Sequence, residues 1–260
     1  MVLKPTEAGR RHATRILAAT AITSMILANS SIQAADTRAG WKTLVNGKSL
    51  KNTRAFTKEW GYNYPWGDTH NGSAKMSPSN ISLSHGVATV KATPVTDQGQ
   101  IHYSSETFYL KKWVTIDAER PKWDISIEAK VPTVKGTWPA FWLTGVKGWP
   151  PESDIMEFKG DSTVWQNTYN GKWDNTLTNV PTAGDWHKYR LVAEMSDANT
   201  VDFHYYIDDD LKATHSQTGF IGQPLWVLFD YQTEGSSGSP GPTDTTYTYL
   251  RNPTILYQTK

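Results

Sequence analysis

The feature that most limits the fold of this chain is a series of short β-type segments separated by turn residues. Apolar and polar residues alternate within the segments, and Gly, Pro, Asn and Asp gather between them. The pattern predicts a hairpin over 81–92 that turns at His85-Gly86, and further strands at 103–110, 123–131, 141–144, 154–158, 188–194, 201–207, 211–215, 225–231 and 247–257. We find no convincing amphipathic helix. Many short, regularly spaced strands predict an all-β sandwich or barrel, and alternation alone does not choose between the two.

The first 34 residues have the three-part pattern of a secretory signal peptide. A start rich in Lys and Arg precedes an apolar run over 16–28, and a stretch of small residues ends at Ala34. The apolar run has 13 residues, fewer than the roughly 20 that a membrane-spanning helix needs. We therefore predict a signal peptide over 1–34, one domain over 35–260, and secretion to the periplasm or the medium. A retained membrane anchor is the less favoured alternative.

Composition limits what the exported domain is expected to bind. Without residues 1–34 the chain keeps 22 of its 26 basic and 24 of its 25 acidic residues, so it has no general attraction for nucleic acid or membranes. Cysteine is absent, which excludes disulfides and thiolate metal sites. The chain has 12 Trp and 12 Tyr. Such aromatic faces can stack on sugar rings, although many of them must pack the core.

Three carboxylates interrupt an apolar, strand-like segment. They are Glu152, Asp154 and Glu157, and a core strand rarely carries three acids by chance because an unpaired buried charge is costly. Residues two apart share a face of a strand, which places Glu152 beside Asp154. One extra residue near Met156, a β-bulge, would bring Glu157 to the same face. The residues then facing the core would be Ile155 and Phe158. Two glutamates flanking an aspartate suit double-displacement hydrolysis of a glycosidic bond.

The acidic motif has a second motif upstream, Trp138-Pro-Ala-Phe-Trp142. Together they resemble glycoside hydrolase family 16, and the bulged Glu-x-Asp-x-x-Glu spacing resembles its laminarinase, agarase and endo-β-1,3-galactanase branches. More loosely, the resemblance extends from about Trp41 to the end of the chain. It implies a β-jelly roll, a sandwich of two bent antiparallel sheets with a substrate cleft on the concave face. Ser153 departs from the aliphatic residue usual in the family, at a position that should face away from the substrate.

The resemblance assigns a role to each acid. Glu152 matches the nucleophile, Glu157 the acid/base residue, and Asp154 is expected to orient Glu152 through a hydrogen bond. Retaining enzymes hold the two catalytic carboxyl groups about 5–5.5 Å apart. Four strand steps separate their backbones by about 13 Å, so the side chains must lean together over a curved, bulged strand. A structural acid cluster or a calcium site is the alternative interpretation.

Further substrate contacts are expected around this strand. By the resemblance, Trp138 forms a wall of the catalytic subsite, whereas Trp142 could equally pack in the core. The other candidates are Trp149, Trp165, Asn167, Tyr169, Gln232 and Glu234. His102 is expected on the surface rather than in the cleft. The Gly/Ser-rich stretch 235–242 is expected to be a mobile loop that either closes over substrate or is a plain flexible connection.

Neither a cofactor nor a catalytic metal is expected. The sequence has no His-Glu-x-x-His spacing, phosphate loop or nucleophile elbow. Many family members hold calcium through an acid in the final strand, and Thr248 stands at that position here, which argues against a structural calcium ion. The run Asp208-Asp-Asp210 is expected to form a hairpin turn rather than a metal site.

Taken together, these features predict a secreted, monomeric, retaining endo-β-glycanase that hydrolyses internal bonds of a polysaccharide. A β-1,3-linked glucan or galactan is the preferred substrate, and an agarose-type galactan is the alternative. A non-catalytic lectin-like module would lack at least one of the three acids. A transglycosylase would pass the glycosyl group to a sugar instead of to water.

Overall fold

The computed structural model describes residues 40–96 and 98–260. The predicted signal peptide and the predicted boundary at residue 34 lie outside these residues and stay predictions. Within the described part, the elements are almost all strands, arranged in two large sheets whose inner faces share one hydrophobic core. The prediction of an all-β sandwich is therefore confirmed, and the barrel is excluded.

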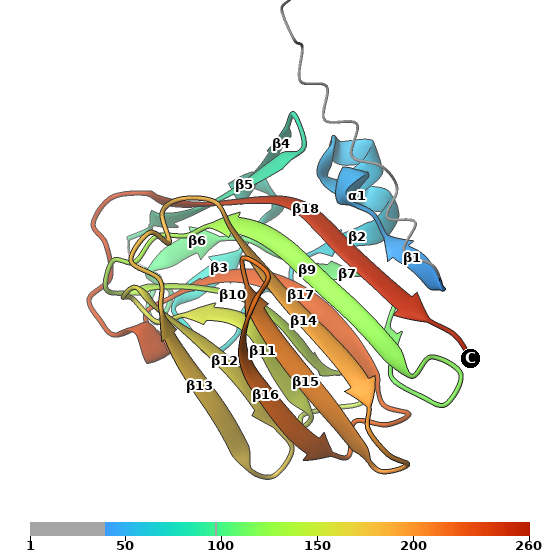
Figure 1. Ribbon diagram of the computed structural model, residues 1–260. Helices are drawn as coiled ribbons and strands as arrows, with labels where there is room; N and C mark the ends of the chain where they lie inside the picture. The colour runs from blue at the N-terminus through green and yellow to red at the C-terminus, as the bar shows by residue number, and fades with distance from the viewer. Residues whose placement is uncertain (1–39, 97) are drawn as a thin grey trace, which may run out of the picture. The chain divides into compact units, whose positions relative to one another are not determined.

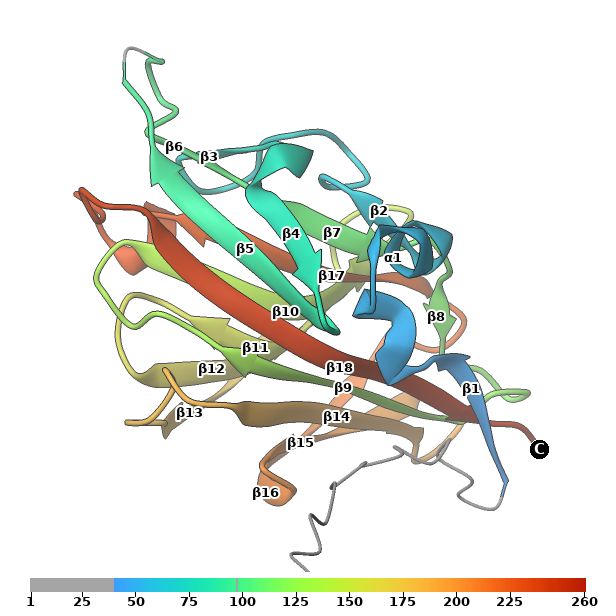
Figure 2. The same cartoon turned by 90° about the horizontal axis from the view of Figure 1, so that it is seen from above.

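The first sheet has the order β16-β15-β14-β9-β18-β5-β6-β3, with β1 beside β18 and β4 beside β5. All its pairs are antiparallel except β3 with β6. Figure 2 shows β5, β18, β9 and β14 lying side by side along this sheet. The bounds are β1 Trp41–Val45, β3 Ala74–Met76, β4 Ile81–Ser84, β5 Val87–Pro94, β6 Tyr103–Ser105, β9 Lys122–Lys130, β14 His187–Met195, β15 Thr200–Ile207, β16 Asp210–Thr218 and β18 Thr246–Gln258.

The second sheet has the order β13-β12-β11-β10-β17-β7-β2, with β8 beside β17. It is antiparallel throughout and lies behind β9, β14 and β15 in the view of Figure 1. The bounds are β2 Trp60–Tyr62, β7 Thr107–Leu110, β8 Val114–Thr115, β10 Thr137–Gly145, β11 Glu152–Phe158, β12 Thr163–Tyr169, β13 Trp173–Asn179 and β17 Pro224–Thr233.

Alternation along the strands explains how the core forms. In β15, Val201, Phe203, Tyr205 and Ile207 are buried while the residues between them are not. Because side chains of a strand point alternately to its two faces, these four pack against the second sheet and their neighbours meet solvent. Predicted turns are confirmed where the backbone needs a positive φ, as at His85 (51°) and Asp208 (52°).

The differences from the sequence-based predictions include one helix, one interrupted strand and several short strands that were not predicted, such as β1, β2 and β13. A helix that was not expected, α1 Thr53–Glu59, is capped by Asn52, whose side chain accepts a hydrogen bond from the Ala55 amide. Only Phe56 of this helix is buried, so it leaves no apolar periodicity to detect. The strand predicted at 103–110 is broken at Glu106, where the chain passes from the first sheet (β6) to the second (β7). Short 3₁₀ turns complete the structure: η1 Gly47–Leu50, η2 Pro78–Asn80 and η3 Gly235–Ser237.

Candidate active site

The three acids lie on β11, in the middle of the second sheet, and the strand carries the predicted bulge. On the β10 side, Phe141 pairs with Met156 and Trp142 with Asp154, which leaves Ile155 as the extra residue. The bulge restores alternation, so that Glu152, Asp154 and Glu157 all share one face. Ile155 and Phe158 are fully buried in the core, as predicted.

The core side of β11 also explains Ser153. Its hydroxyl is fully buried and lies 2.8 Å from the hydroxyl of Tyr205, which donates a hydrogen bond to the carbonyl oxygen of Asn167. Ser153 therefore faces away from the acids, as expected. A polar side chain is tolerated here because the opposite sheet supplies its hydrogen-bond partner.

Each catalytic candidate is held by a neighbouring side chain. The indole Nε1 of Trp149 donates to Glu152 Oε2 (3.0 Å), and that of Trp138 donates to Glu157 Oε1 (2.7 Å). Asn167 on β12 donates from Nδ2 to Asp154 Oδ2 (2.9 Å) and to Glu157 Oε2 (2.9 Å). The expected hydrogen bond between Asp154 and Glu152 is not among the contacts of the described residues. The Asn167 amide instead links Asp154 to Glu157.

Burial and mutual repulsion dominate the electrostatics of this cluster. Burial, with the charge of Glu157 adding to it, raises the pKa of Glu152 to about 7. Burial and the charges of Glu152 and Glu157 raise the pKa of Asp154 well above its ordinary value. Lys159 opposes both shifts. Its ammonium group lies 3.1 Å from Glu157 Oε2 and 4.1 Å from the centre of the Trp165 ring. Burial and mutual repulsion therefore favour the protonated forms of Glu152 and Asp154 over their charged forms.

A cavity of about 660 Å³ opens beside Glu152. Its walls include several aromatic side chains, among them Trp142 and Trp226 from neighbouring strands and Trp66 and His70 from the segment after β2. His70 stacks on Trp142 at a ring separation of 5.8 Å. Trp142 thus both packs in the interior and lines the cavity. Aromatic side chains of this kind can stack on the C–H faces of sugar rings.

Several predicted substrate contacts lie on the same face as the acids. Tyr169 pairs with Glu152 and Trp165 with Glu157 across β11 and β12. The exposed Trp149 stacks on Tyr169 with ring centres 4.7 Å apart, and Tyr169 in turn packs on Trp173 of β13. The structure therefore brings these aromatic residues together next to the acids.

Gln232 and Glu234, which the sequence predicts as substrate contacts, are both buried. Gln232 is 1% exposed and hydrogen-bonds the backbone of Ala74, and Glu234 is 5% exposed and accepts hydrogen bonds from Ser239 and Gly241 in the loop that follows it. Both side chains thus bind the protein itself. The stretch 235–242, which was expected to be a mobile loop, is held in place by hydrogen bonds. Its backbone carbonyl oxygens accept them from the Gly136 amide, the Lys135 ammonium group and the Tyr103 hydroxyl.

Some residues of the site were missed by sequence reasoning. Asp230 on β17 accepts hydrogen bonds from Trp142 Nε1 (2.7 Å) and the Tyr64 hydroxyl (3.0 Å). An acid within the apolar run 225–231 was a usable signal, by the same burial argument that identified the triplet. Trp66 and His70 lie in an irregular segment and left no periodic signal.

Neither a metal-binding cluster nor a membrane-spanning helix occurs among the described residues. No group of three or more His, Asp or Glu side chains among residues 40–96 and 98–260 is arranged to hold a metal ion. Thr248, at the expected calcium position, is fully buried. Within the same part of the chain, no helix has the length and apolar character needed to cross a membrane.

Comparisons with known proteins give a consistent result, although no protein-family model matches the chain. A galactan endo-β-1,3-galactanase of Flammulina velutipes is 37% identical over 211 residues, which cover 76% of this chain and 84% of that protein. The crystal structure of an endo-1,3-β-glucanase from Streptomyces sioyaensis superposes with a TM-score of 0.67 at 18% identity, covering 87% of this chain and all of that one. A non-specific endo-β-1,3(4)-glucanase of family GH16 gives a TM-score of 0.67 at 16% identity, covering 84% and 95%.

Proposed function

Because the chain belongs to glycoside hydrolase family 16, we propose that it is a retaining endo-β-1,3-galactanase. The chain is an endo-β-1,3-glycanase, and the galactan assignment is the finer step. The galactan-cleaving relative is 37% identical, whereas the glucan-cleaving enzymes of similar fold are 16% and 18% identical. The shared sequence of the galactanase is what favours galactan over glucan and over agarose.

The single observation that carries the chemistry is the placement of Glu152, Asp154 and Glu157 on one face of the bulged strand. In the first step a carboxylate oxygen of Glu152 bonds to the anomeric carbon. The bond to the leaving sugar oxygen breaks as Glu157 gives that oxygen a proton. In the second step Glu157 takes a proton from water, whose oxygen bonds to the anomeric carbon and releases Glu152. Two inversions leave the anomeric configuration retained.

The surroundings of the acids support these roles. The hydrogen bonds from Trp138 and Asn167 hold Glu157 from two sides, and Trp149 holds Glu152. Because proton transfer requires the donor within hydrogen-bond distance of the leaving oxygen, such fixed orientation favours catalysis. We propose that Asp154 acts through Asn167, which bonds both Asp154 and Glu157.

The aromatic residues around the acids form the proposed sugar-binding surface. Trp142 and the cavity beside Glu152 would receive sugar rings on one side of the cleaved bond. Trp149, Tyr169 and Trp165 would contact rings on the β12 side. For Asn167, Gln232 and Glu234, the contacts within the protein favour positioning over direct substrate binding.

Activity on defined polysaccharides tests the proposal. The domain over 35–260 and its Glu152→Gln and Glu157→Gln variants would be incubated with debranched β-1,3-galactan, laminarin, mixed-linkage glucan, agarose and κ-carrageenan. We expect the wild type to release galacto-oligosaccharides, seen first as the β-anomer by NMR. The hydrolysis rate of both variants should be lower than that of the wild type by at least about 10²-fold, since acid catalysis alone contributes that much. Circular dichroism would check that they remain folded.

Other outcomes would identify the alternatives. Cleavage of laminarin but not galactan would overturn the galactan assignment, and near-normal rates in either variant would overturn the roles of the acids. Binding without cleavage would indicate the lectin-like function, and longer products at high acceptor concentration a transglycosylase. Secretion and a monomeric state, also part of the proposal, are checked by fractionating a producing cell and by light scattering.

A further inference from the structure

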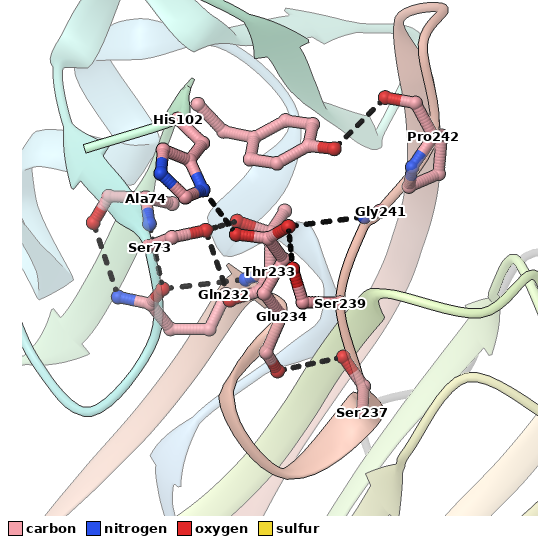
Figure 3. Close-up of polar contacts among 11 residues, drawn as sticks. Ser73, Ala74, His102, Gln232, Thr233, Glu234, Ser237, Ser239, Gly241 and Pro242 are labelled. Carbon is pink, nitrogen blue, oxygen red and sulfur yellow. Dashed lines mark hydrogen bonds and ion pairs between the residues drawn. The ribbon is translucent and has the colours of Figure 1, made fainter. Parts of the chain in front are cut away.

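The carboxylate of Glu234 lies at the centre of a polar network that ties together three parts of the chain. Its Oε1 accepts hydrogen bonds from the Ser239 hydroxyl (2.8 Å) and the Gly241 amide (3.0 Å). Its Oε2 accepts one from His102 Nδ1 (2.5 Å). Figure 3 shows the three donors converging on the carboxylate, His102 from one side and the loop residues Ser239 and Gly241 from the other. An acid so fully occupied by protein donors has little capacity left for substrate.

The charge of Glu234 is stabilised in spite of its burial. Burial alone would raise the pKa of this carboxyl, but hydrogen bonds from Ser73, Ser239, His102 and the Gly241 amide lower it to about 2. The side chain therefore stays ionised throughout the pH range in which a secreted hydrolase works. Its backbone has φ 55° and ψ −134°, a conformation that a non-glycine residue keeps only when its surroundings hold it.

The backbone around Glu234 connects this network to the start of β10. The Glu234 amide donates to the Gly136 carbonyl oxygen (2.8 Å), and the Gly136 amide donates to Ser237 (3.0 Å). The next residue, Gly235, lies against the ring of Trp138. A Cβ atom at position 235 would be 2.5 Å from Cζ3 of that ring and 2.9 Å from the Asn71 carbonyl oxygen. The loop therefore forms one wall of the slot that holds Trp138.

Trp138 is in turn the residue that holds the proton donor, through the 2.7 Å hydrogen bond from Nε1 to Glu157 Oε1. We propose that Glu234 is a positioning residue for the general acid: through Gly235 and Trp138 it fixes the orientation of Glu157. This inference rests on the proposed function, in which Glu157 protonates the leaving oxygen. A small displacement of a proton donor is costly, because catalysis depends on distances of hydrogen-bond length.

A defect in acid catalysis has a kinetic signature that general loss of structure lacks. The leaving group of galactan is a sugar alkoxide, which needs a proton. The leaving group of a dinitrophenyl β-glycoside of a galacto-oligosaccharide is a stable phenolate, which needs none. We expect Glu234→Gln and Gly235→Ala to lower kcat on galactan by about tenfold or more, with KM little changed. Their kcat/KM on the dinitrophenyl substrate should stay within about twofold of wild type, since that step bypasses the acid.

Matched variants separate the possible causes. Gly222 also has a positive φ (75°) but nothing within 4 Å of its Cβ position, so Gly222→Ala strains the backbone without touching a ring. It should keep wild-type rates on both substrates. Glu157→Gln, measured in parallel, should show the same leaving-group selectivity in a stronger form. With the dinitrophenyl substrate, azide should restore its turnover by replacing the water that Glu157 activates.

The outcomes distinguish the proposals. If Glu157→Gln lacks leaving-group selectivity, the proposed function fails. If Glu157→Gln shows it but Glu234→Gln and Gly235→Ala lose both activities equally, or neither, the positioning role of Glu234 is overturned. Should Glu234→Gln not fold, Gly235→Ala and the milder Ser239→Ala carry the test, because each perturbs the same loop without removing the carboxylate.

Discussion

Asp230 is a buried carboxyl group beneath the proposed cleft, and replacing it by asparagine tests how the site makes stability depend on pH. It is 5% exposed and accepts hydrogen bonds from Trp142 and Tyr64. Burial raises its pKa to about 7. The charges of Glu157 and Glu152 add to this, and the two hydrogen bonds only partly oppose it. Asn is a close isostere, and its Oδ1 can still accept from Trp142 while Nδ2 donates to the Tyr64 oxygen.

The sign of the effect follows from the two pKa values. The pKa of Asp230 is about 7 in the folded protein and has its ordinary value of 3.8 in the unfolded chain. The stability it contributes is fully present below about pH 4, falls as pH rises to about 7, and then stays constant. At 1.36 kcal/mol for each pKa unit, a difference of about 3 corresponds to about 4 kcal/mol as an upper estimate. Asn does not titrate. The unfolding free energy of Asp230→Asn, relative to that of the wild type, should therefore rise by up to about 4 kcal/mol between pH 4 and pH 8.

Urea unfolding of both proteins at half-unit steps from pH 4 to pH 8.5 measures this quantity. Only the difference in unfolding free energy between them is informative, because Glu152 and Asp154 also bind protons in both proteins. A difference that changes by less than about 0.5 kcal/mol across this range would refute the reasoning. It would mean that water or rearrangement relieves the buried charge.

Two further predictions concern stability. Tyr205→Phe removes a buried hydroxyl that bonds Ser153, Thr168 and the Asn167 carbonyl, so we expect a loss of about 1–3 kcal/mol in urea unfolding; a loss below about 0.5 kcal/mol would contradict this. Glu234 has a pKa of about 2, below its ordinary value of 4.5, so the stability that its charge contributes is present above about pH 4.5 and is lost as pH falls through about 2. Between about pH 4.5 and pH 2, the difference in unfolding free energy between wild type and Glu234→Gln should therefore shrink by up to about 3 kcal/mol. Acid unfolding of both proteins measures this difference, and a constant difference would count against the network.

Local patterns in the sequence were enough to identify the strand that carries the chemistry. The cost of burying three acids and the two-residue period of a strand place Glu152, Asp154 and Glu157 on one face, and they also require the bulge that the structure has at Ile155. The turns at His85 and Asp208 were predictable for the same reason, because backbone conformation there depends on the residues themselves. The helix α1 escaped detection because a single buried side chain, Phe56, makes no pattern.

The sequence by itself determined which residues of each strand face the same way, and with them the acidic face of β11. Only the tertiary structure decided which strands are neighbours, since alternation carries no information about pairing partners. Pairing of β10 with β17 allows Trp142 to donate a hydrogen bond to Asp230, 88 positions away. The position of the chain just before β6 brings His102 into hydrogen-bond contact with Glu234, 132 positions away. Strand period and burial cost act over a few residues, whereas these contacts depend on how the whole chain closes its sheets. That is why the sequence predicts Gln232 and Glu234 as substrate contacts, whereas in the structure both side chains are buried and bound within the protein.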